Sequence, residues 1–155
     1  MKSILCLILI LFVNSLSFSQ DLSSTKASNE AKNSLVLSAG TILFVSNASI
    51  SYERRLSTIG ARGESSLWVK GRYSKFSGWI TPDEGRFFDA TVFTLLGAGR
   101  SFTELSLGVG MFPYDPSLAP TASVGYRFQK QDGGIIFRTG MGFPELFYLG
   151  LGYSF

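Results

Sequence analysis

The sequence predicts an all-β fold, an eight-stranded antiparallel up-and-down transmembrane β-barrel. Three observations favour this fold: an apolar N-terminal segment typical of export, a succession of short stretches with apolar residues at every second position, and glycines gathered on the polar side of those stretches. The chain has 155 residues, of which 45% are hydrophobic, so it has enough apolar material for one domain.

Residues 1–19 have the pattern of a secretory signal peptide. Lys2 precedes an apolar run from Ile4 to Val13, and Ser17 and Ser19 suit a cleavage site before Gln20. A membrane-spanning helix needs about 20 apolar residues, which makes an uncleaved anchor the weaker alternative. Residues 20–33 are rich in Ser, Asn, Lys, Glu and Ala and predict a flexible periplasmic leader. The barrel itself is expected over residues 34–155.

Eight strands are expected, because the alternation is interrupted by clusters of Gly, Pro, Asp and Ser. In the first stretch Leu35 and Leu37 share one side, and in the second Ile50 and Tyr52 lie opposite Glu53. The fourth stretch is ambiguous in face, whereas the others alternate clearly. In order, the stretches cover 35–43, 48–56, 67–74, 87–96, 103–111, 122–129, 135–143 and 147–155. Eight spanning strands need roughly 80 residues, which residues 34–155 supply.

The distribution of glycine indicates which side of the strands faces inward. Glycine weakens a solvent-exposed strand and offers nothing to pack, whereas inside a narrow barrel it leaves room for long side chains from other strands. The glycines of the last four stretches lie on the same side as the charged residues: Gly108, Gly110, Gly125, Gly140, Gly142, Gly150 and Gly152. The apolar side is therefore expected to face lipid. A lipocalin-like cup or a β-sandwich, either of them soluble and periplasmic, is the alternative fold.

The inward side predicts a charge network inside the barrel. Its expected members are Glu53, Arg55, Lys70, Arg72, Glu104, Arg127 and Arg138. Buried charges must be paired or hydrated, so a salt-bridged plug is the leading interpretation. The surplus of positive charge leaves a weakly anion-favouring passage as the alternative.

If the leader starts in the periplasm, each connection and each aromatic residue can be assigned to one side of the membrane. Connections near Asn47, at 79–85, at 113–120 and at Pro144-Glu145 would face outside, and those at 60–64, 97–100 and 130–134 would face the periplasm. Aromatic residues would form girdles at both boundaries. The outer girdle is expected to contain Tyr73, Phe76, Trp79 and Tyr114, and the inner one Tyr52, Tyr126, Phe128, Tyr153 and Phe155.

The composition argues against several kinds of chemistry. The sequence has no His, so it lacks the usual parts of a Ser-His nucleophile pair or a His-based metal site. The single Cys, Cys6, cannot form an internal disulfide. Asp83 and Glu84 are adjacent acids between Pro82 and Gly85, and we interpret them as residues of an exposed turn rather than as a catalytic pair. A net charge of +3 is too weak for a nucleic-acid footprint. We expect no enzyme activity, no cofactor, no metal and no nucleic-acid partner.

The C-terminal residues carry a resemblance. Gly150, Tyr153 and the final Phe155 are similar to the terminal signal of bacterial outer-membrane barrels, which the barrel-assembly machinery reads. Ser49 to Leu56, Glu104 to Gly110, and Gly125 to Gln129 followed by Gly133 to Gly140 resemble the small outer-membrane β-barrel proteins of Bacteroidota, which are OmpA/OmpX-like. The similarity covers most of residues 34–155.

The resemblance implies an integral barrel of the cell outer membrane and little about activity. We expect a monomer that meets outer-membrane lipid and lipopolysaccharide, periplasmic chaperones and the barrel-assembly machinery. A non-enzymatic structural or surface-interaction role is the leading hypothesis. A gated small-solute or ion passage and a soluble periplasmic binding protein remain as alternatives.

Overall fold

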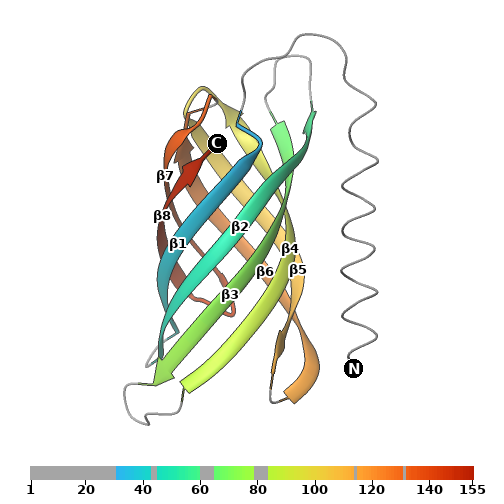
Figure 1. Ribbon diagram of the computed structural model, residues 1–155, viewed down its shortest axis with the longest axis vertical. Coiled ribbons are helices and arrows are strands. Elements are labelled where there is room, and N and C mark those ends of the chain that lie inside the picture. Colours follow the sequence, from blue (N-terminus) through green and yellow to red (C-terminus); the bar gives the residue numbers. More distant parts are fainter. Residues whose placement is uncertain (1–30, 43–44, 60–64, 79–83, 114, 131) are drawn as a thin grey trace.

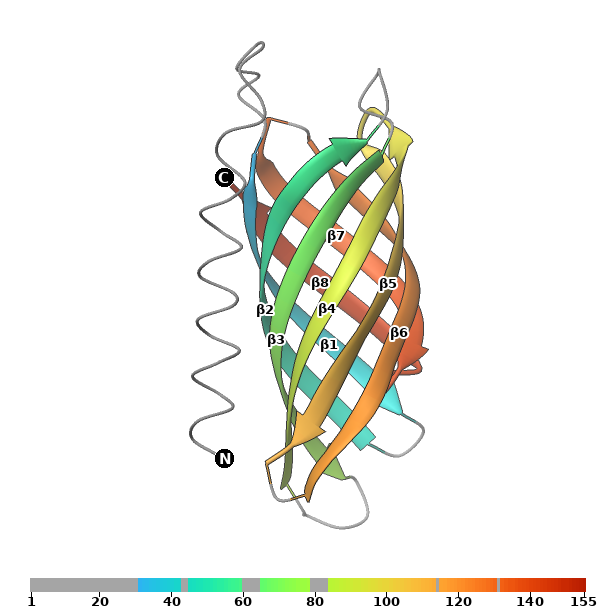
Figure 2. The same ribbon diagram turned by 90° about the vertical axis from the view of Figure 1, so that its right-hand side faces the viewer.

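The computed structural model describes residues 31–42, 45–59, 65–78, 84–113, 115–130 and 132–155. The signal peptide expected over residues 1–19, most of the leader, and Trp79, Asp83 and Tyr114 lie outside this range. Within it, eight strands form one closed antiparallel barrel in chain order (Figures 1 and 2). They are β1 (Asn33–Ile42), β2 (Val45–Ile59), β3 (Ser65–Gly78), β4 (Glu84–Ala98), β5 (Ser101–Phe112), β6 (Asp115–Gln129), β7 (Gly134–Phe143) and β8 (Phe147–Ser154). The predicted fold class is confirmed.

The barrel closes where β1 pairs with β8, with Leu37 opposite Leu151. The seam continues past the strands, because the backbone N–H groups of Lys32 and Asn33 donate to the carbonyl oxygen of Phe155. We call the end that holds these residues, Ile59, Ser65 and the turn at 99–100 the turn end. The opposite end, with Ile42, Val45, Gly78, Glu84 and residues 144–146, is the loop end.

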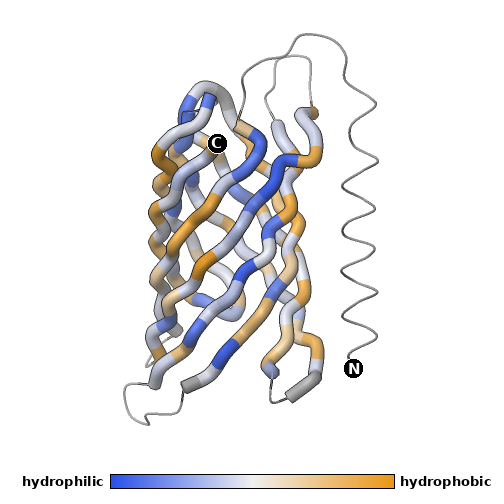
Figure 3. The backbone as a smooth tube through the Cα atoms, viewed as in Figure 1, coloured by the Kyte–Doolittle hydropathy of each residue, from blue (hydrophilic) through white to orange (hydrophobic). Residues whose placement is uncertain are grey.

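Apolar side chains cover the outside of the barrel. Leu107 and Ile135 each expose 72% of their surface, and the rows on β1, β2 and β8 are similarly exposed. Hydrophobic residues recur along the strands between hydrophilic or intermediate ones, as the tube in Figure 3 shows. The face of β4 that was ambiguous in the sequence is settled: Phe87, Asp89 and Phe93 are buried inside, whereas Phe88 and Val92 face outward.

Apolar groups fill both ends of the interior. At the turn end Trp68, Phe93, Leu95 and Phe102 form a buried cluster, in which the Trp68 and Phe93 rings stack with centroids 5.9 Å apart. At the loop end Phe76 meets Phe87 edge-on, with ring centroids 6.3 Å apart. The assignment of Phe76 to the outer girdle was therefore wrong, because this residue shares the inward side of β3 with Arg72 and Ser74.

The connection predicted at 113–120 is much shorter in the structure. β6 begins at Asp115, so only residues 113–114 separate it from β5, and Pro120 lies within the strand opposite Val109. Pairing of β6 with β7 starts only at Ala122. In the described register Pro120 is therefore paired with β5 but not with β7. Proline has no backbone N–H group to donate, so it is tolerated at a strand position that is unpaired on one side.

Inward glycines provide space for large side chains that cross the interior. Gly125, Gly140 and Tyr148 lie side by side on β6, β7 and β8, and the Tyr148 hydroxyl reaches over both glycines. A Cβ atom on Gly140 would lie 2.5 Å from the backbone oxygen of Val124 and 2.6 Å from the Tyr148 hydroxyl. The Val124 oxygen belongs to the backbone, so a movement of side chains alone cannot relieve that close approach.

Gly140→Ala is expected to lower the free energy of unfolding by about 1–3 kcal/mol, because overpacking forces the neighbouring strand or Tyr148 to shift. The matched control is Gly71→Ala on β3, where an added Cβ would meet nothing within 4 Å. This control is expected to be neutral or slightly stabilising. Urea unfolding in lipid vesicles measures both. Equal effects of the two substitutions would contradict the packing argument.

Candidate functional site

Five charged residues meet in the turn-end half of the interior; we call them the five-residue cluster. They are Glu53, Lys70, Glu104, Arg127 and Arg138, contributed by β2, β3, β5, β6 and β7, and all are buried. Glu53 is the most closely bound acid: its carboxylate accepts a hydrogen bond from Arg127 at 2.6 Å and one from Arg138 at 2.8 Å. These short charge-assisted bonds join strands on different sides of the interior.

Glu104 is held more loosely in the same cluster. Its carboxylate oxygens lie 3.6 Å from Arg127, 3.6 Å from Arg138 and 3.7 Å from Lys70. Arg127 also donates to Gln129 at 2.7 Å and to Ser34 at 3.3 Å. Its guanidinium carbon lies 5.4 Å from the centroid of the Trp68 ring, which joins the cluster to the apolar turn end.

A second group, the loop-end cluster, surrounds Arg72. The Arg72 guanidinium contacts Asp89 at 2.6 Å and Glu145 at 2.7 Å. Asn47 donates a short hydrogen bond to Glu145, and Thr91 donates to Asp89 at 2.9 Å. One cation is thus clamped by two carboxylates that are themselves hydrogen-bonded.

The structure adds two inward residues at this end of the barrel. Glu145 lies in the expected connection between β7 and β8, but its side chain is buried inside the barrel. The N–H of Gly142 donates to the Glu145 carbonyl oxygen, and the N–H of Leu146 donates to that of Thr41, which holds the connection in place. Asn47 is not in a connection but within β2, on its inward side. Sequence reasoning also missed Asp89, because the face of its strand could not be assigned.

The charge balance of the interior differs from the surplus that the sequence suggested. Lys70, Arg72, Arg127 and Arg138 supply four positive charges, and Glu53, Asp89, Glu104 and Glu145 supply four negative ones. Among the described residues the two clusters are therefore neutral together. The sequence suggested a surplus because it counted Arg55, assigned Glu145 to a connection and left the face of Asp89 open.

Arg55 lies apart from both clusters, near the turn end. It is half-buried, and its guanidinium carbon lies 5.9 Å from the centroid of the Trp68 ring. The strand register shifts between Arg55 and Ser57, which ends the regular alternation of β2 at this point. Six of the seven predicted network residues thus join the ionic clusters, and Arg55 caps the aromatic group beside them.

The space between the clusters is small. A cavity of about 10 Å³ is bordered by Lys70, Arg72, Arg138 and Glu145, together with Thr121 and Tyr148. This volume suits about one water molecule, whereas small-molecule sites span roughly 300–1,000 Å³. In the described part of the chain the Thr121 and Tyr148 hydroxyls, which border this cavity, have no hydrogen-bond partner. The interior of the described barrel is packed rather than open.

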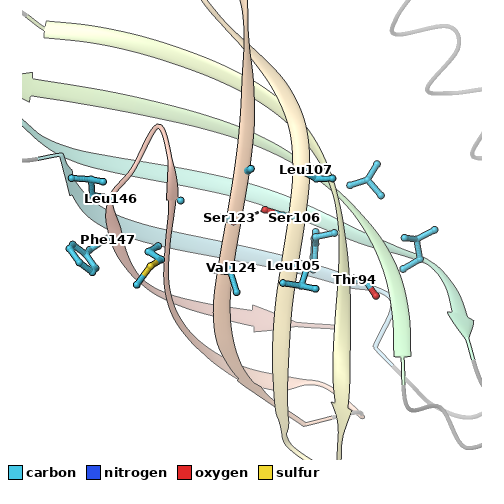
Figure 4. Close-up of a pocket in the computed structure, with 14 residues that line it drawn as sticks. Thr94, Leu105, Ser106, Leu107, Ser123, Val124, Leu146 and Phe147 are labelled. Carbon is cyan, nitrogen blue, oxygen red and sulfur yellow. Dashed lines mark hydrogen bonds between the residues drawn. The ribbon is translucent and has the colours of Figure 1, made fainter.

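A larger groove, of about 880 Å³, lies on the outside (Figure 4). Leu105, Leu107 and Val124 line it from β5 and β6, and Leu146 and Phe147 border it near the start of β8. The Ser106 and Ser123 hydroxyls bind each other on the interior side of these strands. The groove is an apolar depression in the outer surface and offers no charged group.

The structure also places the C-terminal residues. Gly150 faces inward, where an added Cβ would lie 2.6 Å from the Ser38 hydroxyl and 3.0 Å from the Arg138 side chain. Tyr153 and Phe155 point outward and are about 60% exposed. Gly150 therefore accommodates the five-residue cluster, whereas the two aromatic side chains remain available to other molecules.

Other kinds of site find no support in the described ranges. Among these residues no group of His, Cys, Asp and Glu side chains is arranged to hold a metal ion. No helix within them has the length and apolarity to cross a bilayer.

Fold and interior define the class: a closed eight-stranded antiparallel barrel with ionic clusters inside and apolar rows outside. Among solved structures, the chain is similar to a de novo designed transmembrane β-barrel, TMB2.3, determined by solution NMR. The TM-score is 0.55 at 14% sequence identity, over 84% of this chain and 97% of the designed one. At that identity the likeness concerns the fold alone. No protein-family model and no curated protein matches the sequence.

Glu53→Gln is expected to lower the free energy of unfolding by about 3–5 kcal/mol, because two buried guanidinium groups lose the acid that binds both. Glu104→Gln, at the same depth, is expected to cost clearly less because its contacts are about 1 Å longer. Urea titration in vesicles compares the two variants. A larger loss for Glu104→Gln would contradict this ranking.

Proposed function

We propose that this protein is a non-enzymatic integral barrel of the outer membrane, with a lumen closed by its own side chains and a structural or surface-interaction role. The observation that carries the proposal is the placement of charge. Eight ionic groups are paired inside, whereas the outward strand side chains that the structure describes carry charge only near the two ends, at Arg54, Lys75 and Arg86. A barrel in water would bury the apolar rows instead.

The height of the uncharged outer band suits a bilayer. On β4 it runs from Phe88 to Leu96. At about 3.3 Å per residue this is about 30 Å of strand, or roughly 21 Å along the barrel axis for a tilt of about 45°. Outer-membrane barrels have an apolar band of about 25 Å.

A soluble lipocalin-like cup or a sandwich fits these observations poorly. Such a protein keeps apolar side chains around a dry centre, whereas here the centre holds Glu53, Arg127 and Arg138. The exposed apolar rows surround the barrel and would promote aggregation in water.

The surroundings that we propose follow from the sequence. The apolar segment at 1–19 favours export, and Gly150, Tyr153 and Phe155 favour recognition by the barrel-assembly machinery after periplasmic chaperones have kept the chain unfolded. We place the protein among the small OmpA/OmpX-like barrels of Bacteroidota, as a monomer in contact with outer-membrane lipid and lipopolysaccharide. In this orientation the loop end faces outside.

The proposal predicts heat-modifiable migration. The protein is expected in the outer-membrane fraction, and the unheated sample is expected to run at a different apparent mass from the boiled one, because a closed barrel resists unfolding by detergent. Electrophoresis after fractionation measures this. Recovery in the soluble periplasmic fraction with no shift would overturn the proposal.

A gated passage is the second candidate function, because Glu145, which holds Arg72, belongs to a connection rather than to a strand. If residues 144–146 moved away from the interior, Arg72 would lose its contact with Glu145 while the strand pairs stayed intact.

We expect no steady large conductance from the wild-type protein in planar bilayers. We expect none from Glu145→Gln either, because the five-residue cluster and the buried apolar cluster around Trp68 still close the interior. Arg138→Gln tests the deeper cluster in the same recordings. Sustained opening of Glu145→Gln alone would favour the gate over the plug.

A further inference from the structure

Four cationic side chains at the turn end have no acidic partner within the described part of the chain. They form two pairs, Lys32 with Arg54 and Arg100 with Lys130; Arg54 is half-buried and the others are exposed. The cations of the two interior clusters differ, because each of them meets a carboxylate. Asp132 is the one exposed acidic side chain among the described turn-end residues, and it forms no ion pair with them. The turn end therefore carries positive charge that its own groups leave unpaired.

The first pair is held where the barrel closes. Arg54 on β2 is the cross-strand partner of Asn33 on β1. The carbonyl oxygen of Lys32 accepts a hydrogen bond from the N–H of Arg55 at 2.8 Å, just past the end of the β1 ladder. The backbones of Lys32 and Arg54 are therefore fixed on neighbouring strands at one place on the rim.

The second pair lies about four strands away, on the other side of the closed barrel. Arg100 belongs to the turn between β4 and β5, and Lys130 directly follows β6. The N–H of Gln129 donates to the carbonyl oxygen of Arg100 at 2.9 Å, which holds the two segments side by side. Like charges that are held near each other repel, so each pair favours an anion that comes from outside the chain.

Exposed aromatic side chains lie next to both pairs on the outer side of the strands. Tyr52 precedes Arg54 by two residues on β2, and Phe128 precedes Lys130 by two residues at the end of β6. Two residues of strand span about 7 Å. Aromatic residues of membrane barrels lie at the boundary between acyl chains and headgroups. The two cation pairs therefore lie at the depth of the headgroups, with apolar rings between them and the membrane centre.

We propose that the two turn-end pairs bind the phosphate groups of anionic glycerophospholipids in the membrane leaflet at that end. A guanidinium group binds phosphate through two parallel N–H donors, and the ammonium group beside it adds a compact positive charge. The acyl chains of these lipids would lie along the apolar rows next to Tyr52 and Phe128. The inference rests on the proposed membrane location and names the lipid class that this end of the barrel recognises.

Urea unfolding in vesicles of two compositions tests the proposal. Wild type, Lys32→Gln with Arg54→Gln, Arg100→Gln with Lys130→Gln, and the variant with all four changes are compared in phosphatidylcholine and in phosphatidylcholine that contains phosphatidylglycerol. Each cation near an anionic surface is expected to add roughly fivefold to the folding equilibrium constant, so loss of one pair is expected to cost roughly 25-fold in the anionic vesicles. The same changes are expected to have little effect in phosphatidylcholine alone. If the variant with all four changes kept the wild-type preference for phosphatidylglycerol, the proposal would be overturned.

Two controls separate the effect of charge from effects on folding. Lys32→Arg with Arg54→Lys keeps both charges and is expected to keep the preference for phosphatidylglycerol. Lys75→Gln with Arg86→Gln removes two exposed cations at the loop end and is expected to lose clearly less, because Lys75 already has an interaction within the chain. An equal loss at the two ends, or a lost preference in the variant that keeps both charges, would overturn the proposal.

Two further measurements distinguish a lipid from a free anion, and this inference from the proposed function. Inorganic phosphate, added to phosphatidylcholine vesicles at the concentration of the phosphatidylglycerol headgroups, is expected to leave unfolding unchanged. Stabilisation as large as that by phosphatidylglycerol would assign the pairs to a free anion and overturn the proposal. Heat-modifiable migration is measured on every vesicle sample: its absence refutes the membrane barrel itself, whereas a normal shift without dependence on the four cations refutes only this inference.

Discussion

The pairing of charges inside a closed cylinder is the constraint on which the rest of this structure depends. A charged group that is taken out of water is costly unless partners of opposite charge surround it. Here Arg127 and Arg138 share Glu53, and Arg72 is clamped by Asp89 and Glu145. Arg72 and Asp89 face each other on the neighbouring strands β3 and β4. The contacts of Glu53 with Arg127 and Arg138, and that of Arg72 with Glu145, join parts of the chain that are far apart in the sequence, so they form only when the barrel closes. The long-range ion pairs therefore form only in the closed barrel, and they stabilise that closed state.

Shape complementarity inside the barrel follows from the same narrow bore. Tyr148 fits over Gly125 and Gly140, Phe87 lies against Gly110, and the Arg138 side chain lies against Gly150. Small residues thus stand where a large neighbour needs the space. The aromatic groups at the two ends shield the ionic clusters from water, which strengthens the electrostatic interactions between them.

A packed interior moves the search for function to the outer surface and the loop end. The groove in Figure 4 and the rows around it are apolar, so they match acyl chains rather than a soluble ligand. Connections at the loop end are short where the structure describes them, which limits the area that a large partner could contact. Contact with membrane lipid is the interaction that we propose for this surface.

The alternation of residues predicted eight strands and the faces of all of them but β4, because a side chain's side of a strand depends only on its parity in the sequence. It placed Glu53, Lys70, Arg127 and Arg138 together on the inward side. Which acid binds which base was decided by the tertiary structure, since the stagger of eight closed strands sets the height of each residue. Glu145 shows the difference best: next to a proline it has the appearance of a surface turn, and only the folding of that connection into the bore makes it a partner of Arg72.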